Sequence, residues 1–476
     1  MIRRVLLALV AGIVVAVLLE MVTVTPRSII DFTAFYCAGQ VIRDQGDPYR
    51  AQPLGACEAK LGSEGIYGVR GVVMPAPLPP YALAPFAALA SLPYGRALVI
   101  WRLLLLAAIT ATIVALRKVA KLSWPTVALA LLIIDVLMNI PPGQPMPIVV
   151  AATAIGAWAL TRGSDRLAGA VTCLTMVEPH IGLPACLSLY LYRPAARASL
   201  LWGSMIAAAL SVIVMPASAN IEYLTKVLPH HAASEIPWFL QVSLTHVLYV
   251  LGASDQASLA AGSVSYVAML SFAMLTAPRA ATSLGVPGLL IALPAAAAVL
   301  GGTFIHLTQV AAAIPAALIL AGREETSISR LGGAACVLLV LPGLWVGIPG
   351  IVFIAAGVAA LLTALLLRPP RVVSTAIAIA VLAGGLALHG LHPIKTEAGR
   401  GLAVTPARAS ALAEDSWGRF VRAEDPGIPE HRLELLAAVP TWAGLGLLCG
   451  AAALGAFAGV RGKAKAEAAI PDPCGG

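Results

Sequence analysis

The sequence predicts an all-α polytopic membrane protein, and three observations support this. Of the 476 residues, 59% are hydrophobic and 11% are charged, against about 25% charged in an ordinary soluble domain. The mean hydropathy is +0.89. Apolar runs of about 20 residues, the length that crosses a bilayer, recur along the chain. The formal net charge of +8 therefore indicates basic cytoplasmic loops and not a nucleic-acid partner.

The apolar runs predict about twelve to fourteen transmembrane helices. The first, 5–23, follows Arg3 and Arg4 without a small-residue cleavage site, so we interpret it as an uncleaved helix with a cytoplasmic N-terminus. Residues 166–192 are broken at Glu178 and the proline after it, which predicts a hairpin of two short helices. The other predicted spans are 94–116, 125–140, 147–161, 198–215, 258–278, 284–300, 303–321, 331–347, 350–367, 372–391 and 439–460.

The basic residues test this topology, because cytoplasmic loops of membrane proteins carry excess Lys and Arg. Counted outward from a cytoplasmic N-terminus, every basic cluster between two spans falls on the cytoplasmic side. Three long polar segments then lie outside, at 24–80, 216–243 and 393–438. Loops of this length in a compact protein usually carry function.

Asp31 follows the first apolar run and opens the stretch "DFTAFYCAGQVIRDQGDPYR". Ionisable residues near the hydrocarbon are costly, which favours a functional role. The alternative is a helix N-cap, because Asp caps well and the next residues have helical spacing. Composition alone supports the two interpretations equally. Gly46 and Pro48 end this expected helix, so the first outer loop is predicted to contain a short helix.

His230 and His231, with Glu222 and Glu235, raise the question of a metal site. Their spacing is irregular, and no carboxylate–histidine pair has a helical interval that would favour metal binding. We therefore interpret them as solvated loop residues and predict no metal ligands.

Two further pairs of residues have spacings or positions that allow a contact. Cys37 and Cys57 both fall on the first outer loop, where disulfides persist, so the two can form a bridge. Asp135 and Asn139 are one helical turn apart within a predicted span. They either line a cavity or pair, with each other or with a neighbouring helix.

Short motifs follow one another in a set order over roughly residues 1 to 320. They are Asp31, Phe35-Tyr36, Ala38-Gly39, Gly46, Pro48-Tyr49, "PAPLPPY" ending at Tyr81, Gly143-Gln144, Ala168-Gly169, "TMVEPHIGLP", Ser243-Leu244 and "GTFIHLTQVAAAIP" with His306 and Pro315. This order and spacing resembles glycosyltransferase family 87, membrane enzymes of the GT-C type that move a sugar, usually mannose, from a polyprenyl-phosphate carrier. One position departs from the family pattern: Glu178 stands where the family usually has a lysine before the proline.

The resemblance implies a GT-C-type glycosyltransferase fold in a bacterial inner membrane, with Asp31 as general base for the acceptor hydroxyl. It implies a polyprenyl-phosphate-linked sugar donor, a glycan or lipid acceptor among the membrane lipids, and no cofactor, with the metal requirement left open. The leaving lipid phosphate needs cationic or hydrogen-bonding partners. The expected donor- and acceptor-binding residues are Tyr36, Tyr49, Tyr81, Arg102, Gln144, Glu178, His180, Ser243 and His306.

The expected organisation has three parts. They are a GT-C-like catalytic core at 1–322, C-terminal helices at 323–462 that include the outer loop 393–438, and a disordered cytoplasmic tail at 463–476. Two other function classes remain. A transporter predicts inverted repeats and charges at the midplane of several spans, and the sequence has neither. A non-catalytic relative is the third class, because Glu178 inverts a charge that the family uses.

Overall fold

The computed structural model describes residues 24–136, 138–238, 240–347, 411–424 and 428–468. In these residues the chain is helical, and β-type pairing is confined to isolated bridges. The predicted first span and the spans at 350–367 and 372–391 lie outside the described residues, as do residues 469–476 at the end of the predicted tail.

Four helices of the described residues are long and apolar enough to cross a membrane, which confirms four of the predicted spans. These stretches are α5 (Tyr94–Ala120), Pro194–Val214 with α10 (Arg197–Val214), α14 (Asp255–Ser283), and Ala438–Phe457 within α21 (Ile428–Ala468). The other described spans are occupied by shorter apolar helices: α6 (Trp124–Leu131) with the π-turn Leu132–Val136, α7 (Met146–Thr161), α15 (Leu289–Gly301), α16 (Ile314–Ala321) with the 3₁₀ turn Leu307–Ala313, and the stretch Thr326–Pro342 of α17 (Thr326–Gly347).

The predicted break in 166–192 is present. Helix α8 (Asp165–Thr172) and a 3₁₀ turn precede Glu178, and α9 (Pro179–Tyr192) follows it. Glu178 itself is non-helical, with φ −114° and ψ 86°. The cause is local, because a proline disfavours helical geometry in the residue before it and is well tolerated at the first position of a helix. The break therefore places Glu178 and His180 at the start of α9.

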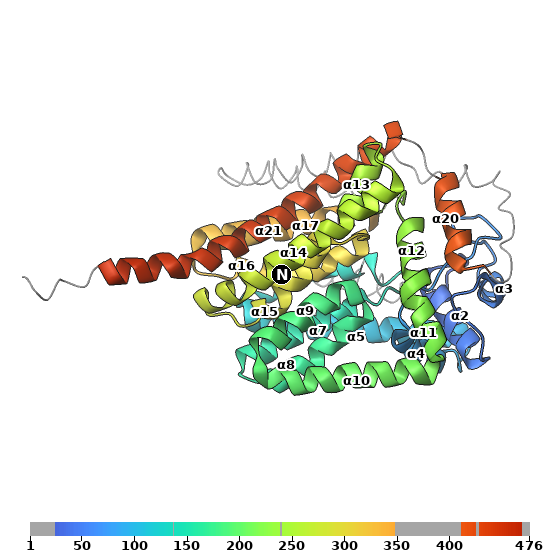
Figure 1. The fold of residues 1–476 in the computed structure, drawn as a ribbon, viewed down its shortest axis with the longest axis horizontal. Helices are drawn as coiled ribbons and strands as arrows, with labels where there is room; N and C mark the ends of the chain where they lie inside the picture. Colours follow the sequence, from blue (N-terminus) through green and yellow to red (C-terminus); the bar gives the residue numbers. More distant parts are fainter. Residues whose placement is uncertain (1–23, 137, 239, 348–410, 425–427, 469–476) are drawn as a thin grey trace, which may run out of the picture.

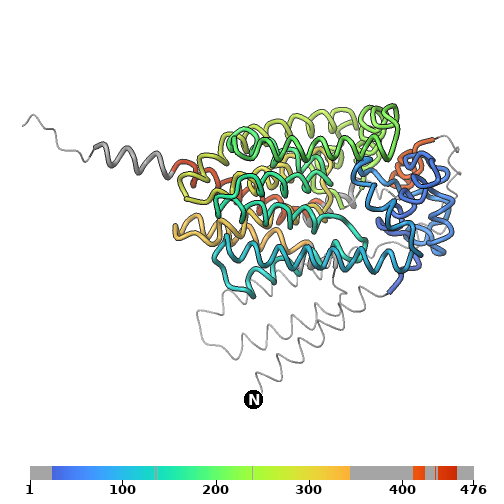
Figure 2. The backbone as a smooth tube through the Cα atoms, turned by 90° about the horizontal axis from the view of Figure 1, so that it is seen from below, coloured from blue at the N-terminus to red at the C-terminus, as the bar shows by residue number. Residues whose placement is uncertain are grey.

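The residues that the structure describes form two hydrophobic cores. One lies among the apolar helices, chiefly α5, α7, α15, α16, α17 and α21. The other joins α2 (Asp31–Arg43), α3 (Ala51–Leu61), α4 (Pro80–Leu89) and α20 (Ala413–Glu424), which we call the head. The head lies at one end of the helix bundle in both views (Figures 1 and 2). Helix α5 belongs to both cores, because Leu98 packs in the head and Leu116 in the bundle.

The described parts of the three segments predicted to lie outside meet at the head, with residues 393–410 of the third lying outside the described residues. Ala51 N–H donates to Ala411 O (2.8 Å) and Ala413 N–H donates to Tyr49 O (2.9 Å), which ties α20 to the first segment. Helices α11 (Ala217–Glu222) and α12 (Leu228–Ser234) join them, because Glu222 pairs with Arg50 at 2.6 Å. The segments share one end of the molecule, as a shared side of the membrane requires.

A disulfide links the first two helices of the head. Cys37 of α2 is bonded to Cys57 of α3, with their Cα atoms 5.6 Å apart. The remaining cysteines of the described residues, Cys173, Cys186, Cys336 and Cys449, are free.

Candidate active site

Asp31 is the first residue of α2 and is half-buried. Its Oδ2 accepts a hydrogen bond of 2.7 Å from Gln144 Nε2. The N-cap of α2 is Ile30, and no side chain caps the helix, so the N-cap interpretation of Asp31 is wrong. Its carboxylate instead points to a partner from the distant turn before α7.

The local sequence explains how Gln144 reaches Asp31. Gly143 has φ +80°, and a Cβ there would lie 2.6 Å from Phe32 Cβ, so only glycine allows this turn to approach α2. Trp101 Nε1 donates to Gly143 O at 2.8 Å, and its ring stacks on Phe32 with centroids 6.3 Å apart. The Gly-Gln motif thus holds an amide donor against the carboxylate.

Burial sets the proton affinity of Asp31. It raises the pKa of this carboxyl from 3.8 to about 6, although the Gln144 hydrogen bond lowers it. Removing water destabilises the charged form, whereas a donor to the carboxylate stabilises it. A carboxylate with a pKa near 6 is mostly ionised at neutral pH and is a much stronger base than a solvated aspartate.

Glu178 and His180 lie beside each other at the start of α9. Glu178 is buried, and its Oε2 accepts from Gln309 Nε2 at 3.2 Å. His180 Nδ1 lies 3.8 Å from the same oxygen. Phe304 packs against the His180 ring, with centroids 5.3 Å apart. The break in the helix therefore brings a carboxylate and an imidazole together.

A second acid–imidazole group lies where α12 ends. Glu235 Oε2 is 3.6 Å from His306 Nε2, and Trp417 Nε1 donates a hydrogen bond to Glu235 Oε1. His306 reaches this place because its segment pairs with residues 240–242, through Val242 N–H to Ile305 O (2.8 Å). His231, one turn before Glu235, has a ligand-type ring nitrogen in the same group.

The pKa values of these groups depend on one another's charges. On the 216–243 segment, burial raises the pKa of Glu235 to about 8; the Trp417 hydrogen bond opposes this and the charge of Asp31 adds to it. Burial lowers the pKa of His231 to about 3, and the nearby His306 and His180 contribute to this shift. Asp31, Glu235 and the histidines are therefore within electrostatic range of one another.

The other residues predicted from the resemblance make structural contacts in the free protein. The hydrogen-bond partners of their hydroxyl and guanidinium groups are mostly backbone carbonyls. Tyr36 donates to Leu92 O (2.8 Å), Tyr49 to Leu78 O (2.9 Å), Tyr81 to Met176 O (2.6 Å), Arg102 to Val24 O (2.7 Å) and Pro141 O (3.3 Å), and Ser243 to Gln241 Oε1 (3.0 Å) while capping α13 (Leu244–Val250).

The structure corrects the interpretation of His231 and Glu235 as solvated. Their exposed fractions are 6% and 3%, because α20 and residues 304–306 pack over the end of α12. His230 is exposed, as predicted. A local signal that the sequence interpretation passed over is the four-residue interval between His231 and Glu235, which is one helical turn. The burial itself depends on covering residues that are distant in the chain. Asp135 and Asn139 pair with each other, with Asn139 Nδ2 donating to Asp135 Oδ1 at 3.3 Å.

The fold and this site define a multi-helical membrane protein with carboxylates and imidazoles gathered where the head meets the bundle. The model of glycosyltransferase family 87 matches residues 78–293, somewhat under half of the chain. The match confirms the resemblance and indicates a glycosyltransferase. It includes Gln144, Glu178 and Glu235 but neither Asp31 nor His306. No characterised protein and no solved structure matches the chain.

Proposed function

We propose that the protein is a GT-C-type membrane glycosyltransferase. It transfers a hexose, with mannose the first candidate, from a polyprenyl-phosphate-linked donor to a lipid or glycan acceptor at the outer face of the membrane. The observation that carries the proposal is Asp31, which accepts a hydrogen bond from Gln144 and has a pKa of about 6. The family match supports the reaction class, and the donor follows from the family resemblance.

In the proposed step, the acceptor oxygen attacks the anomeric carbon and gives its proton to Asp31. The bond between that carbon and the phosphate oxygen breaks, and the electron pair leaves with the lipid phosphate. A positioned carboxylate contributes about 10²- to 10⁴-fold to such a step. Gln144 assists by keeping Asp31 ionised and oriented before the acceptor binds.

Asp31→Asn tests the proposal. The substitution keeps the size of the side chain and removes the base, and because Asp31 does not cap α2 the fold should survive. We expect the transfer of radiolabelled sugar from polyprenyl-phosphate-mannose to membrane lipid acceptors to fall by about 10² or more. The melting temperature in detergent should stay close to that of the wild type.

Asp44→Asn is the matched control, because Asp44 is exposed at the other end of α2. It should retain wild-type transfer. An Asp31→Asn variant that folds normally and remains nearly as active as the wild type would show that the base lies elsewhere. If the Asn variant proves unstable, Asp31→Glu, which retains a carboxylate, should restore folding and part of the activity.

A further inference from the structure

Three ligand-type side chains converge at the end of α12. His231 comes from the helix, Glu235 follows its last residue, and His306 comes from the segment before the 3₁₀ turn Leu307–Ala313. One ring nitrogen of each histidine and one carboxylate oxygen lie within 4.8 Å of one another. His231 and Glu235 are one helical turn apart in the sequence, whereas His306 is distant and only the fold brings it to them.

Two atoms of this group are buried without a hydrogen-bond partner. They are His231 Nδ1 and Glu235 Oε2, on side chains that are more than nine-tenths buried. Buried polar atoms in native proteins almost always have partners, so two unpartnered atoms on residues of one such cluster indicate a missing ligand. The other carboxylate oxygen, Oε1, is held by Trp417 Nε1–H, which fixes the orientation of Glu235.

The donor set selects the class of ligand. Two imidazole nitrogens and one carboxylate oxygen form a set that binds Zn²⁺ and related divalent transition metals, with one coordination position left open. Mg²⁺ and Ca²⁺ prefer oxygen ligands throughout. Ligand atoms at about 2.0–2.1 Å from a tetrahedral ion are roughly 3.3 Å apart, and His306 Nε2 and Glu235 Oε2 are already 3.6 Å apart.

We propose that His231, Glu235 and His306 form a binding site for one divalent transition-metal ion of the Zn²⁺ class. Trp417 is a positioning residue that orients the carboxylate, as partners of metal ligands usually do. The open coordination position is available to an anionic ligand.

The role of the ion rests on the proposed function. A departing lipid phosphate needs positive charge beside it. Among the described residues, the ion-pair partners of Glu178 and Glu235 are His180 and His306, and neither is Lys or Arg. A metal ion at this site would supply the cation, with a phosphate oxygen of the donor as its fourth ligand.

Metal binding can be measured on the purified full chain without any substrate. The protein is stripped with EDTA, dialysed against Zn²⁺, and its metal content is measured by mass spectrometry. We expect one tightly bound equivalent in the wild type. Co²⁺ in place of Zn²⁺ should give the visible absorption of a four-coordinate N/O site.

Variants locate the ion. Glu235→Gln and His306→Gln should each weaken Zn²⁺ binding by more than about 100-fold, and Trp417→Phe by about 10- to 100-fold. His230→Ala is the matched control, because His230 neighbours His231 but is exposed, and its Nδ1 lies 2.8 Å from the Lys226 carbonyl oxygen and outside the ligand group. It should retain the bound equivalent.

The absence of a bound equivalent in the wild type, or its persistence in both Glu235→Gln and His306→Gln, would overturn the site. If Glu235→Gln fails to fold, His306→Gln decides, since this histidine is partly exposed. The two proposals fail separately. If the wild type still transfers sugar in EDTA, the ion has no catalytic role. If the protein binds the metal but transfers no sugar, the metal site stands and the proposed glycosyltransferase activity is wrong.

Discussion

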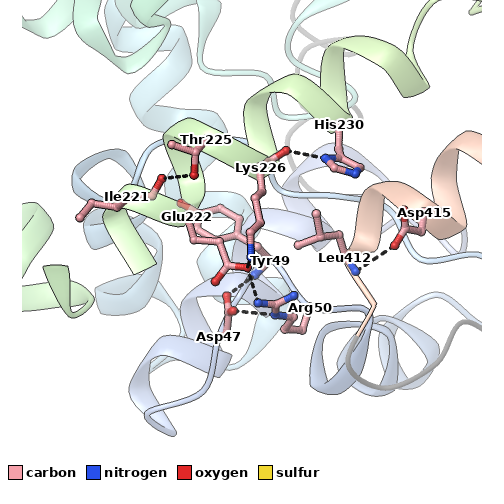
Figure 3. A network of polar contacts seen from close by, with 10 residues as sticks. All are labelled: Asp47, Tyr49, Arg50, Ile221, Glu222, Thr225, Lys226, His230, Leu412 and Asp415. Carbon is pink, nitrogen blue, oxygen red and sulfur yellow. Dashed lines mark hydrogen bonds and ion pairs between the residues drawn. The ribbon is translucent and has the colours of Figure 1, made fainter. Parts of the chain in front are cut away.

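His230 and His231 are consecutive residues of α12 that face opposite environments. His230 belongs to an exposed polar network in which Glu222 pairs with Arg50 at 2.6 Å and with Lys226 at 3.3 Å (Figure 3). His231 faces the buried group around Glu235 and His306. Both groups tie the 216–243 segment to other parts of the molecule, yet they differ in charge balance.

In the exposed network Asp47 and Glu222 each have a basic counter-charge. Arg50 bridges Asp47 at 2.9 Å and Glu222, and the network needs no further ligand. The buried group has a carboxylate opposite imidazoles, with orphaned atoms. Burial of uncompensated polar groups costs free energy, and folds keep it mainly where function requires it. We therefore infer a structural role for the first group and a chemical role for the second.

The largest effect expected from this assignment is on the pH dependence of transfer. Burial raises the pKa of Asp31 to about 6, so the carboxyl takes up a proton as the pH falls through 6 and no longer acts as a base. We expect kcat/KM to fall about tenfold for each pH unit below 6. Glu178, Glu235 and Tyr67 lie within electrostatic range of Asp31, so the same profile should be measured in Asp31→Asn.

The residual activity of Asp31→Asn should lack this decrease below pH 6, which we call the acid limb of the profile. If the decrease remains at the same pH in the variant, a group other than Asp31 is responsible for it. The pH profile would then give no support for Asp31 as the base. Asp47 serves as the comparison within the exposed network, and Asp47→Asn should retain the limb at about pH 6.

A smaller effect is expected from Gln144→Met, which preserves the volume of the side chain but removes its N–H donor. The hydrogen bond from Gln144 lowers the pKa of Asp31, so its loss should move the acid limb upward by about one pH unit. Transfer at pH 6 should therefore fall by roughly fivefold, because the ionised fraction falls from about one half to about one tenth, and transfer above pH 8 should change little. An unshifted limb would mean that Gln144 does not tune this carboxylate.

The sequence was informative where the signal is local. The Gly-Gln motif at Gly143 and the break at Glu178 follow from glycine and proline stereochemistry, and both position site residues. The burial of Glu235 was not foreseeable in this way. Its covering partners, His306 and Trp417, are distant in the chain. No helical or strand periodicity predicts contacts between residues so far apart in the sequence. Tertiary packing alone turned an apparently solvated loop end into a buried group.

The smallest effect expected is on the exposed network itself. Arg50 and Glu222 are partly exposed, with side-chain exposures of 28% and 25%, and such pairs contribute about 0.2–1 kcal/mol. A double-mutant cycle with Arg50→Ala and Glu222→Ala, measured as the free energy of unfolding in mixed micelles, should give a coupling in this range that shrinks in 1 M salt. The more exposed pair Arg27–Glu64, at 4.0 Å, should show no measurable coupling.

Transfer by Arg50→Ala should remain within about threefold of the wild type, because a surface pair affects stability by too little to alter the site. A loss of transfer as large as that of Asp31→Asn would place the exposed network in the catalytic machinery and would contradict the division drawn between His230 and His231.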